Sequence, residues 1–210
     1  MTDQASSETR QDASGAKHSG NRYGRSEQAR RAVLAAVDDL LVEVGFAALT
    51  IEGIATRAGV AKQTIYRWWP SKVDILLDAL GDDLAEHLTP AEHGDLEQEL
   101  TAHLAAVAEF LAESDAGAML RALTGVALHD SAIAERLRTE HLARQRERDR
   151  LPLRRAVSRG ELPAELDLDR AIDQLLGPIY YRVLVTGQPV PRAFTEELVR
   201  EFLARHRGRG

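Results

Sequence analysis

The sequence predicts an all-α protein in which a small unit of three short helices precedes a longer helical bundle. Apolar residues recur at helical spacing along most of the chain, and beyond Leu80 no segment alternates apolar and polar residues as a half-buried strand would. Glycine or proline stands near several of the expected helix ends. We expect three parts: an N-terminal arm at 1–21, the three-helix unit at 22–72 and the bundle at 73–210.

The first helix of the three-helix unit has an apolar stripe and no chemistry of its own. Ser26 is a plausible N-cap, and Gly45 is expected to end the helix. Between them, one face carries Val33, Leu34, Val37, Leu40, Leu41 and Val44. This helix is expected to supply the third wall of a small core.

Residues 50–72 predict two short helices around a glycine turn. Thr50 is a good N-cap for the first helix, and Gly59 can adopt the left-handed backbone that ends it. The inner face of this helix carries Ile51, Ile54, Ala55 and Ala58. Val60 fills the turn, and the second helix, expected over 61–69, keeps on a broad inner arc Ala61, Ile65, Trp68 and Trp69.

The outward face of the second helix suits a DNA duplex. It presents Gln63, Thr64, Tyr66 and Arg67. Arginine can grip guanine and glutamine can grip adenine through paired hydrogen bonds, whereas threonine and tyrosine can donate to phosphate oxygens. The arrangement predicts a helix-turn-helix whose second helix enters the major groove. We expect the DNA contacts to come from Thr50, Lys62, Gln63, Thr64, Tyr66, Arg67, Trp68 and Lys72.

A further helix follows the motif after a clear stop. Pro70 prevents easy continuation, Ser71 can cap, and apolar residues then recur at Val73, Leu76, Leu77, Leu80, Leu84 and Leu88. Lys72 lies in the first turn of this helix. Together with the amides of the helix start, it is expected to clamp a DNA phosphate.

Residues 26–80 resemble the DNA-binding domain of the tetracycline-repressor (TetR) family of bacterial regulators. The family pattern is matched at Gly45, Phe46, Thr50, Ile54, Ala55, Ala58, Gly59, Val60, Thr64, Tyr66 and Lys72. Two positions depart from it. Ala61 stands where the family usually has a capping residue, at a cost of roughly 1 kcal/mol to the helix start. Trp69 replaces the usual phenylalanine in the same packing position.

The resemblance implies that the bundle binds a small molecule among its central helices and dimerises through its last two. Here those two would be residues 167–186 and 194–206, and the expected interface residues are Leu175, Ile179, Val183, Phe194, Leu198 and Phe202. Gly177 and Pro178 should kink the first of them. The segment G-P-I-Y-Y-R also resembles C-terminal domains of an actinobacterial TetR subgroup. The alternative for the same apolar stripe is an ordinary intrachain core helix.

Candidates for lining a ligand pocket lie on or beside apolar faces of the central helices: His87, His103, Val107, Phe110, Met119, Leu123, His129 and Tyr180. The alternative for each of these residues is a place in the ordinary core or at its boundary. The apolar bias favours a hydrophobic or aromatic effector.

Charge is divided unevenly along the chain. Residues 22–72 hold 8 Lys and Arg against 5 Asp and Glu, a balance of +3, whereas residues 73–210 have a balance of −8. Only residues 22–72 therefore carry the net positive charge that suits binding to a polyanion. Residues 136–155 carry eight arginines interleaved with acidic residues, which indicates a solvated, ion-paired face rather than a second nucleic-acid surface.

The arm at 1–21 is rich in Ser, Gly, Asp and Gln and is expected to be disordered. At its end, Arg22, Tyr23 and Arg25 could reach DNA, but a solubilising tail is the favoured interpretation. The chain has no cysteine, which excludes disulfides and thiolate metal sites, and it lacks a signal peptide and any long apolar run. We therefore expect a cytoplasmic protein without cofactor or metal.

The sequence thus predicts a homodimeric, DNA-binding transcriptional regulator, a repressor of a near-palindromic operator that a small hydrophobic or aromatic ligand releases. A ligand-independent regulator, either an activator or an architectural DNA binder, is the alternative. A helical enzyme is a weaker one, because the chain has no G-x-S-x-G elbow, no phosphate-binding glycine loop and no H-E-x-x-H.

Overall fold

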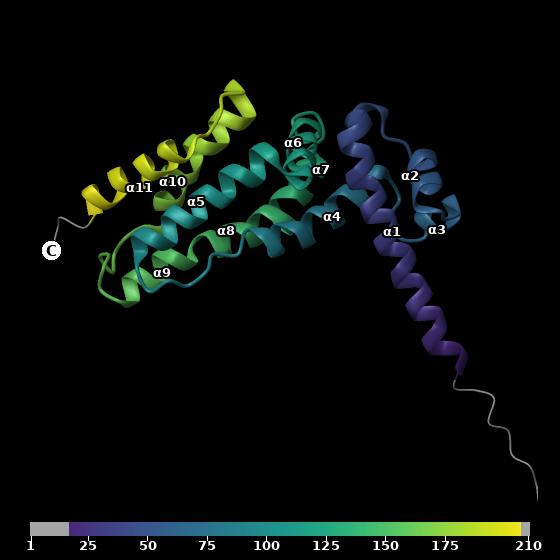
Figure 1. The fold of residues 1–210 in the computed structure, drawn as a ribbon, viewed down its shortest axis with the longest axis horizontal. Coiled ribbons are helices and arrows are strands. Elements are labelled where there is room, and N and C mark those ends of the chain that lie inside the picture. Colours follow the sequence, from purple (N-terminus) through teal and green to yellow (C-terminus); the bar gives the residue numbers. More distant parts are fainter. Residues whose placement is uncertain (1–16, 207–210) are drawn as a thin grey trace, which may run out of the picture.

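The computed structural model describes the backbone of residues 17–206, and the side chains of residues 26–206 apart from Asp82. Over that range the chain forms helices and no strand, as predicted. Figure 1 shows an elongated molecule, with α2 and α3 at one end and α10 and α11 at the other. Helix α4 (Lys72–His87) runs from the small N-terminal unit into the bundle.

Helix α1 (Lys17–Ala48) begins well before the Ser26 cap that the sequence predicts. The backbone of residues 17–21 is helical, so the expected disorder of the arm is wrong for these positions, and the rest of the arm lies outside the described residues. Gly45 breaks the helical backbone as expected, with φ 73° and ψ 168°, although one more turn follows it. Val44 is 49% exposed, so the apolar stripe of α1 ends before it.

Helix α2 (Ile51–Ala58) has the two ends that its sequence predicts. The Thr50 hydroxyl accepts a hydrogen bond from the Gly53 amide at 3.0 Å, and Gly59 is left-handed at φ 65°. A side chain at Gly59 would be strained in that conformation.

Helix α3 (Lys62–Tyr66) is shorter than the expected span of 61–69. Ala61 provides no side-chain cap, in agreement with the predicted weak start. Beyond Tyr66 the chain tightens, because the amides of Trp68 and Trp69 both bond to the carbonyl of Ile65. The helix therefore ends before Pro70, which has no N–H group to donate a further helical hydrogen bond.

Helix α4 closes the core of the N-terminal unit. Ser71 and Asp74 form a capping box at its start. One turn later, Asp78 accepts hydrogen bonds from the Trp69 indole at 3.0 Å and from Arg30 of α1 at 2.8 Å. This carboxylate ties α1, the end of the helix-turn-helix and α4 together.

Lys72 is half-buried, and its ammonium packs against the end of α1. It donates to the carbonyl oxygens of Phe46 at 2.8 Å and Leu49 at 2.9 Å, and it lies 4.2 Å from the centroid of the Phe46 ring. These carbonyls follow the break at Gly45 and have lost regular helical partners. Lys72 therefore acts as a C-terminal cap for α1.

The bundle consists of helices of unequal length and two π-helical turns. In chain order these are α5 (Leu96–Glu113), α6 (Asp115–Ala127), α7 (Ser131–Arg136), η1 (Leu137–Leu142), α8 (Ala143–Asp149), α9 (Leu151–Ser158), α10 (Leu168–Tyr181), η2 (Arg182–Thr186) and α11 (Arg192–His206). The backbone stays helical from α7 through η1 into α8. Ser114 joins α5 to α6, and Gly117 in the first turn of α6 lies so close to α5 that a Cβ would meet the Phe110 carbonyl at 1.9 Å.

Asp38 of α1 is a carboxylate at the junction of the two parts, where α1 packs on α4 and α6. Its Oδ1 atom is buried without a hydrogen-bond partner. Burial raises the pKa of Asp38 to about 7, and the nearby carboxylates of Asp83 and Asp115 add to this effect. The junction therefore favours a protonated Asp38.

Lys72→Gln should lower the free energy of unfolding by about 1–3 kcal/mol, because a charge-assisted donor to two carbonyls is lost. Urea denaturation followed by circular dichroism measures the change. Lys62→Gln is the matched control, since Lys62 pairs with Glu52 on the open surface. Equal stability of Lys72→Gln and Lys62→Gln would refute the capping role.

Asp38→Asn should raise the melting temperature relative to the parent at pH 8 but hardly at pH 4. The folded pKa of Asp38 lies above its unfolded value, so its unfavourable contribution appears as pH rises from about 4 through 7. Calorimetric melting temperatures of both proteins across this pH range measure the difference. A constant difference at all pH values would contradict the raised pKa.

Candidate DNA-binding surface and ligand pocket

The polar face of α3 points away from the protein. Gln63, Tyr66 and Arg67 are exposed and Thr64 is half-buried. Ile65 and Trp69 fix the helix from behind, with 0% and 4% of their surface exposed. The face that the sequence assigned to DNA is therefore free to approach a duplex.

Several of the predicted DNA-contacting side chains already have neighbours within the chain. Lys62 pairs with the exposed Glu52, a contact that a phosphate would have to displace. Arg67 lies 5.2 Å from the ring of Trp68, which is half-buried and packs edge-on against Trp69. The Thr50 hydroxyl caps α2 and still has its own proton to donate. Gln63 and Tyr66 make no side-chain hydrogen bond with any described residue.

Lys72 makes contacts that the sequence interpretation did not foresee. Two of the three N–H groups of its ammonium donate to the carbonyls of Phe46 and Leu49, which leaves one for a phosphate. The sequence pattern placed Lys72 correctly in the first turn of α4. It could not show that the end of α1 lies within reach of that position.

A cavity of about 580 Å³ lies in the bundle between the η1–α8 segment and α10. Its walls are mainly apolar where Leu142, Ala143, Ile172 and Leu176 face it. We call it the α8–α10 pocket. The full set of lining residues is Arg138, Leu142, Ala143, Gln145, Arg146, Asp149, Ile172, Asp173, Leu176, Gly177 and Tyr180.

One end of the α8–α10 pocket is polar and held in place by buried hydrogen bonds. The Asp149 carboxylate contacts the His103 imidazole at 2.9 Å and accepts from the Gln145 amide at 2.7 Å. The same amide nitrogen donates to the Leu88 carbonyl at 3.0 Å. Burial raises the pKa of Tyr180, and the Asp149 charge adds to the rise. The Tyr180 phenol is thus a permanent hydrogen-bond donor at neutral pH.

Among the residues that the sequence suggested for ligand binding, Tyr180 alone lines the α8–α10 pocket. His103 lies behind its polar end. The others are either closed core or exposed surface: Val107, Phe110, Met119 and Leu123 are at most 4% exposed, and His87 and His129 are exposed. These six side chains lie away from the α8–α10 pocket.

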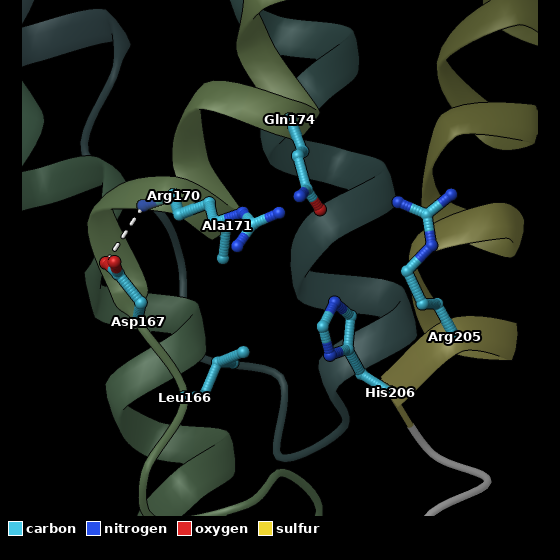
Figure 2. Close-up of a pocket in the computed structure, with 7 residues that line it drawn as sticks. All are labelled: Leu166, Asp167, Arg170, Ala171, Gln174, Arg205 and His206. Carbon is cyan, nitrogen blue, oxygen red and sulfur yellow. Dashed lines mark hydrogen bonds between the residues drawn. The ribbon is translucent and has the colours of Figure 1, made fainter.

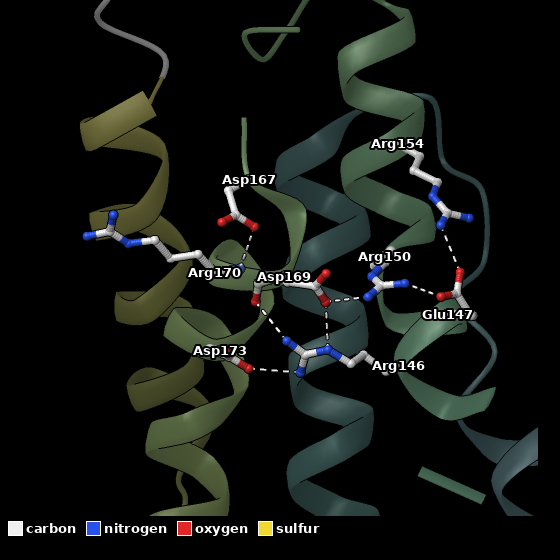
Figure 3. A network of polar contacts seen from close by, with 8 residues as sticks. All are labelled: Arg146, Glu147, Arg150, Arg154, Asp167, Asp169, Arg170 and Asp173. Carbon is white, nitrogen blue, oxygen red and sulfur yellow. Dashed lines mark hydrogen bonds and ion pairs between the residues drawn. The ribbon is translucent and has the colours of Figure 1, made fainter. Parts of the chain in front are cut away.

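Gln145 and Asp149 are pocket residues that the sequence interpretation missed. They lie within the arginine-rich segment, one helical turn apart, and are 2% and 4% exposed. Most of the arginines there behave as predicted: Figure 3 shows Arg146 bound to Asp169 and Asp173, and Arg154 bound to Glu147. The signal that the interpretation missed is their i, i+4 spacing. It places the Gln145 amide and the Asp149 carboxylate on the same face of the helix as Leu142.

The predicted dimer residues occupy two kinds of position in the single chain. Leu175, Ile179 and Phe202 are at most 4% exposed within a single chain, because α10 and α11 pack on α5 and on each other. Val183, Phe194 and Leu198 are half-buried. The strongest apolar stripe of α10 therefore serves the chain's own core, whereas Tyr181 and Val185 remain 59% and 69% exposed.

In the described part of the chain, no three or more histidine or acidic side chains are grouped as a metal ion would require. None of the helices between residues 17 and 206 combines the length and the apolar content that crossing a membrane demands.

Comparison with known proteins agrees with this architecture. Residues 33–79 match the bacterial regulatory proteins of the tetR family, and residues 90–202 match the tetracyclin repressor-like C-terminal domain. The HTH-type transcriptional regulator YdeS of Bacillus subtilis is 35% identical, over 83% of this chain and 88% of its own length. A DNA-binding transcriptional repressor TetR of Mycobacteroides abscessus is 28% identical, over 85% of this chain and 94% of its own.

Solved structures give the same result. The TetR family transcription regulator SCO0332 superposes with a TM-score of 0.73 at 34% identity, and the match covers 84% of this chain and 97% of that one. With both domains matched in order, and an exposed polar recognition face on α3, the chain belongs to the TetR family of helix-turn-helix transcriptional regulators.

Proposed function

We propose that this protein is a homodimeric repressor that binds a near-palindromic DNA operator and is released by a small hydrophobic or aromatic ligand. The observation that carries the DNA-binding part is the outward polar face of α3, anchored from behind by Ile65 and Trp69. The similarity to the Mycobacteroides abscessus repressor supports repression.

On DNA, the roles of the α3 side chains follow from their chemistry. The Arg67 guanidinium donates two hydrogen bonds to guanine, and the Gln63 amide forms paired hydrogen bonds with adenine. Tyr66 and Thr64 donate to phosphate oxygens. One such short helix covers only a few base pairs. Two copies related by a two-fold axis reach successive major grooves about 34 Å apart, or a larger separation, which gives the operator its symmetry.

The dimer contact that we propose uses the outer apolar side of the last two helices. Tyr181 and Val185 are exposed there, and Val183, Phe194 and Leu198 are partly covered. Large exposed apolar side chains on adjacent turns are costly in water and mark an interaction surface. Leu175, Ile179 and Phe202 then support this surface from within rather than contacting the partner.

The effector site that we propose is the α8–α10 pocket. Its volume of about 580 Å³ is in the range of small-molecule sites. Apolar walls with Asp149 and Tyr180 at one end suit an aromatic or aliphatic ligand with a hydrogen-bonding group. This cavity favours ligand control over the ligand-independent alternative.

A continuous set of contacts joins this pocket to α3. Arg138 and Leu142 of η1 line the pocket, while the other side of η1 places His141 against Gly81 of α4. Immediately before η1, Arg136 bonds to Asp74 in the first turn of α4 at 2.5 Å.

Through α4, these contacts reach the DNA-reading helix. Asp78 on α4 holds Trp69 at the end of the helix-turn-helix. A ligand that reshapes the π-helical turn would therefore shift α4 and the recognition helix with it. Such turns are frequent at functional sites because their strained hydrogen bonding has nearby alternatives.

Arg67→Ala should weaken binding to the selected operator and remove about 1–3 kcal/mol of preference at one base pair. The operator is obtained by selection from random duplexes, and affinity is measured by fluorescence anisotropy. Arg154→Ala, which loses only an exposed ion pair with Glu147, is the control and should bind like the parent. A parent protein that binds no duplex at low salt would rule out the proposed function.

Gly177→Leu should abolish release by ligand while leaving operator affinity unchanged. The new side chain would enter the α8–α10 pocket, which Gly177 lines from an open position with no atom within 4 Å of its Cβ. A compound screen for operator release supplies the ligand, and release is then titrated for each variant. Gly125→Leu on α6 is equally unhindered but lines none of the described pockets, so it should respond like the parent. Full response by Gly177→Leu would exclude this pocket.

A further inference from the structure

A second cavity, of about 420 Å³, lies between the start of α10 and the end of α11. Figure 2 shows its lining: Leu166, Asp167, Arg170, Ala171, Gln174, Arg205 and His206. We call it the α10–α11 pocket. Helix α10 contributes to both cavities through different faces, because Arg170 and Gln174 face this one and Ile172 and Leu176 face the other.

The α10–α11 pocket gathers positive charge that the protein leaves without partners. Among the described arginine side chains, Arg144, Arg170 and Arg205 make no hydrogen bond, ion pair or ring contact. Two of these, Arg170 and Arg205, line the same cavity from opposite helices. Both side chains are exposed and solvated, so their guanidinium groups are available to a dissolved anion at this cavity.

The acidic residues near Arg170 are already committed elsewhere. Figure 3 shows Asp169 held by Arg146 and Arg150, and Asp173 held by Arg146, while the Arg170 side chain extends away from this network. The remaining carboxylate, Asp167, lies on the rim of the pocket and caps α10 by accepting from the Arg170 backbone amide at 3.1 Å. The Arg170 side chain therefore makes no ion pair with any of these three carboxylates.

Other side chains complete the chemistry of the site. In Figure 2 the Gln174 amide, the Arg205 guanidinium and the His206 ring point toward the space between the two helices. His206 is backed by Phe202, with ring centroids 4.6 Å apart. Ala171, 2% exposed, and Leu166 give the cavity an apolar floor.

We propose that the α10–α11 pocket binds a small organic anion, with its carboxylate or phosphate between Arg170 and Arg205 and its apolar part on Leu166 and Ala171. Guanidinium groups form paired, charge-assisted hydrogen bonds with such anions. The Gln174 amide supplies a further donor. This site is separate from the proposed effector pocket and does not depend on DNA binding.

The test is isothermal titration calorimetry of the full-length protein without DNA, with sodium hexanoate and inorganic phosphate as probes. Sodium chloride at equal ionic strength controls for screening. We expect saturable binding of one anion per chain, and tighter binding of hexanoate if its tail uses the apolar floor. The double variant Arg170→Gln/Arg205→Gln should bind at least about tenfold more weakly, as expected for the loss of charge-assisted hydrogen bonds.

Arg144→Gln is the matched control, because Arg144 is the third arginine without a partner and lines none of the described pockets. It should bind both probes like the parent. Equal affinity of the double variant and the parent, or no saturable binding by the parent, would overturn the proposal. Size-exclusion chromatography of the parent and both variants adds a further outcome. If the parent binds neither probe and the double variant alone is no longer a dimer, the two arginines contact a second subunit. The proposal is then wrong.

Discussion

The Asp78 carboxylate is the contact on which the arrangement of the two domains depends. It lies on α4, a helix that belongs to both domains, and it accepts hydrogen bonds from Trp69 after α3 and from Arg30 on α1. On the same face of this helix, Asp74 is held by Arg136 and Gly81 lies against His141. Helix α4 is thus fixed from both domains at successive turns, and neither domain can move without disturbing it.

This constraint explains why Lys72 has a structural role in addition to the DNA contact predicted for it. The start of α4 must be held against the end of α1 if Asp78 is to reach both Trp69 and Arg30. The Lys72 ammonium provides that attachment through the carbonyl oxygens of Phe46 and Leu49, which follow the break at Gly45. A lysine at a helix start near DNA has two possible partners, a phosphate or a backbone carbonyl, and sequence spacing does not distinguish between them.

Features decided by neighbours in the chain could be predicted from the sequence. Thr50, Gly59 and Ser71 act as caps because their partners lie within a few residues. Features decided by distant packing could not: the apolar stripe through Leu175 and Ile179 is equally suited to a chain's own core or to a partner, and its burial within the single chain appears only once α10 packs on α5. Gln145 and Asp149 were hidden for the same reason, since Asp149 is held by His103 of another helix and Gln145 by the distant Leu88 carbonyl.

The π-helical turn at Leu137–Leu142 has a consequence for how this chain can vary over evolution. A π-helical turn contains one residue more than the α-helical turn that it replaces. Deletion of one residue there would restore a regular helix, but it would rotate every later residue of the helix by about 100° relative to α7. Gln145 and Asp149 would swing away from His103, and the cavity wall would be built from different side chains. A one-residue deletion at this turn would therefore rebuild the cavity wall while leaving α2 and α3 unchanged.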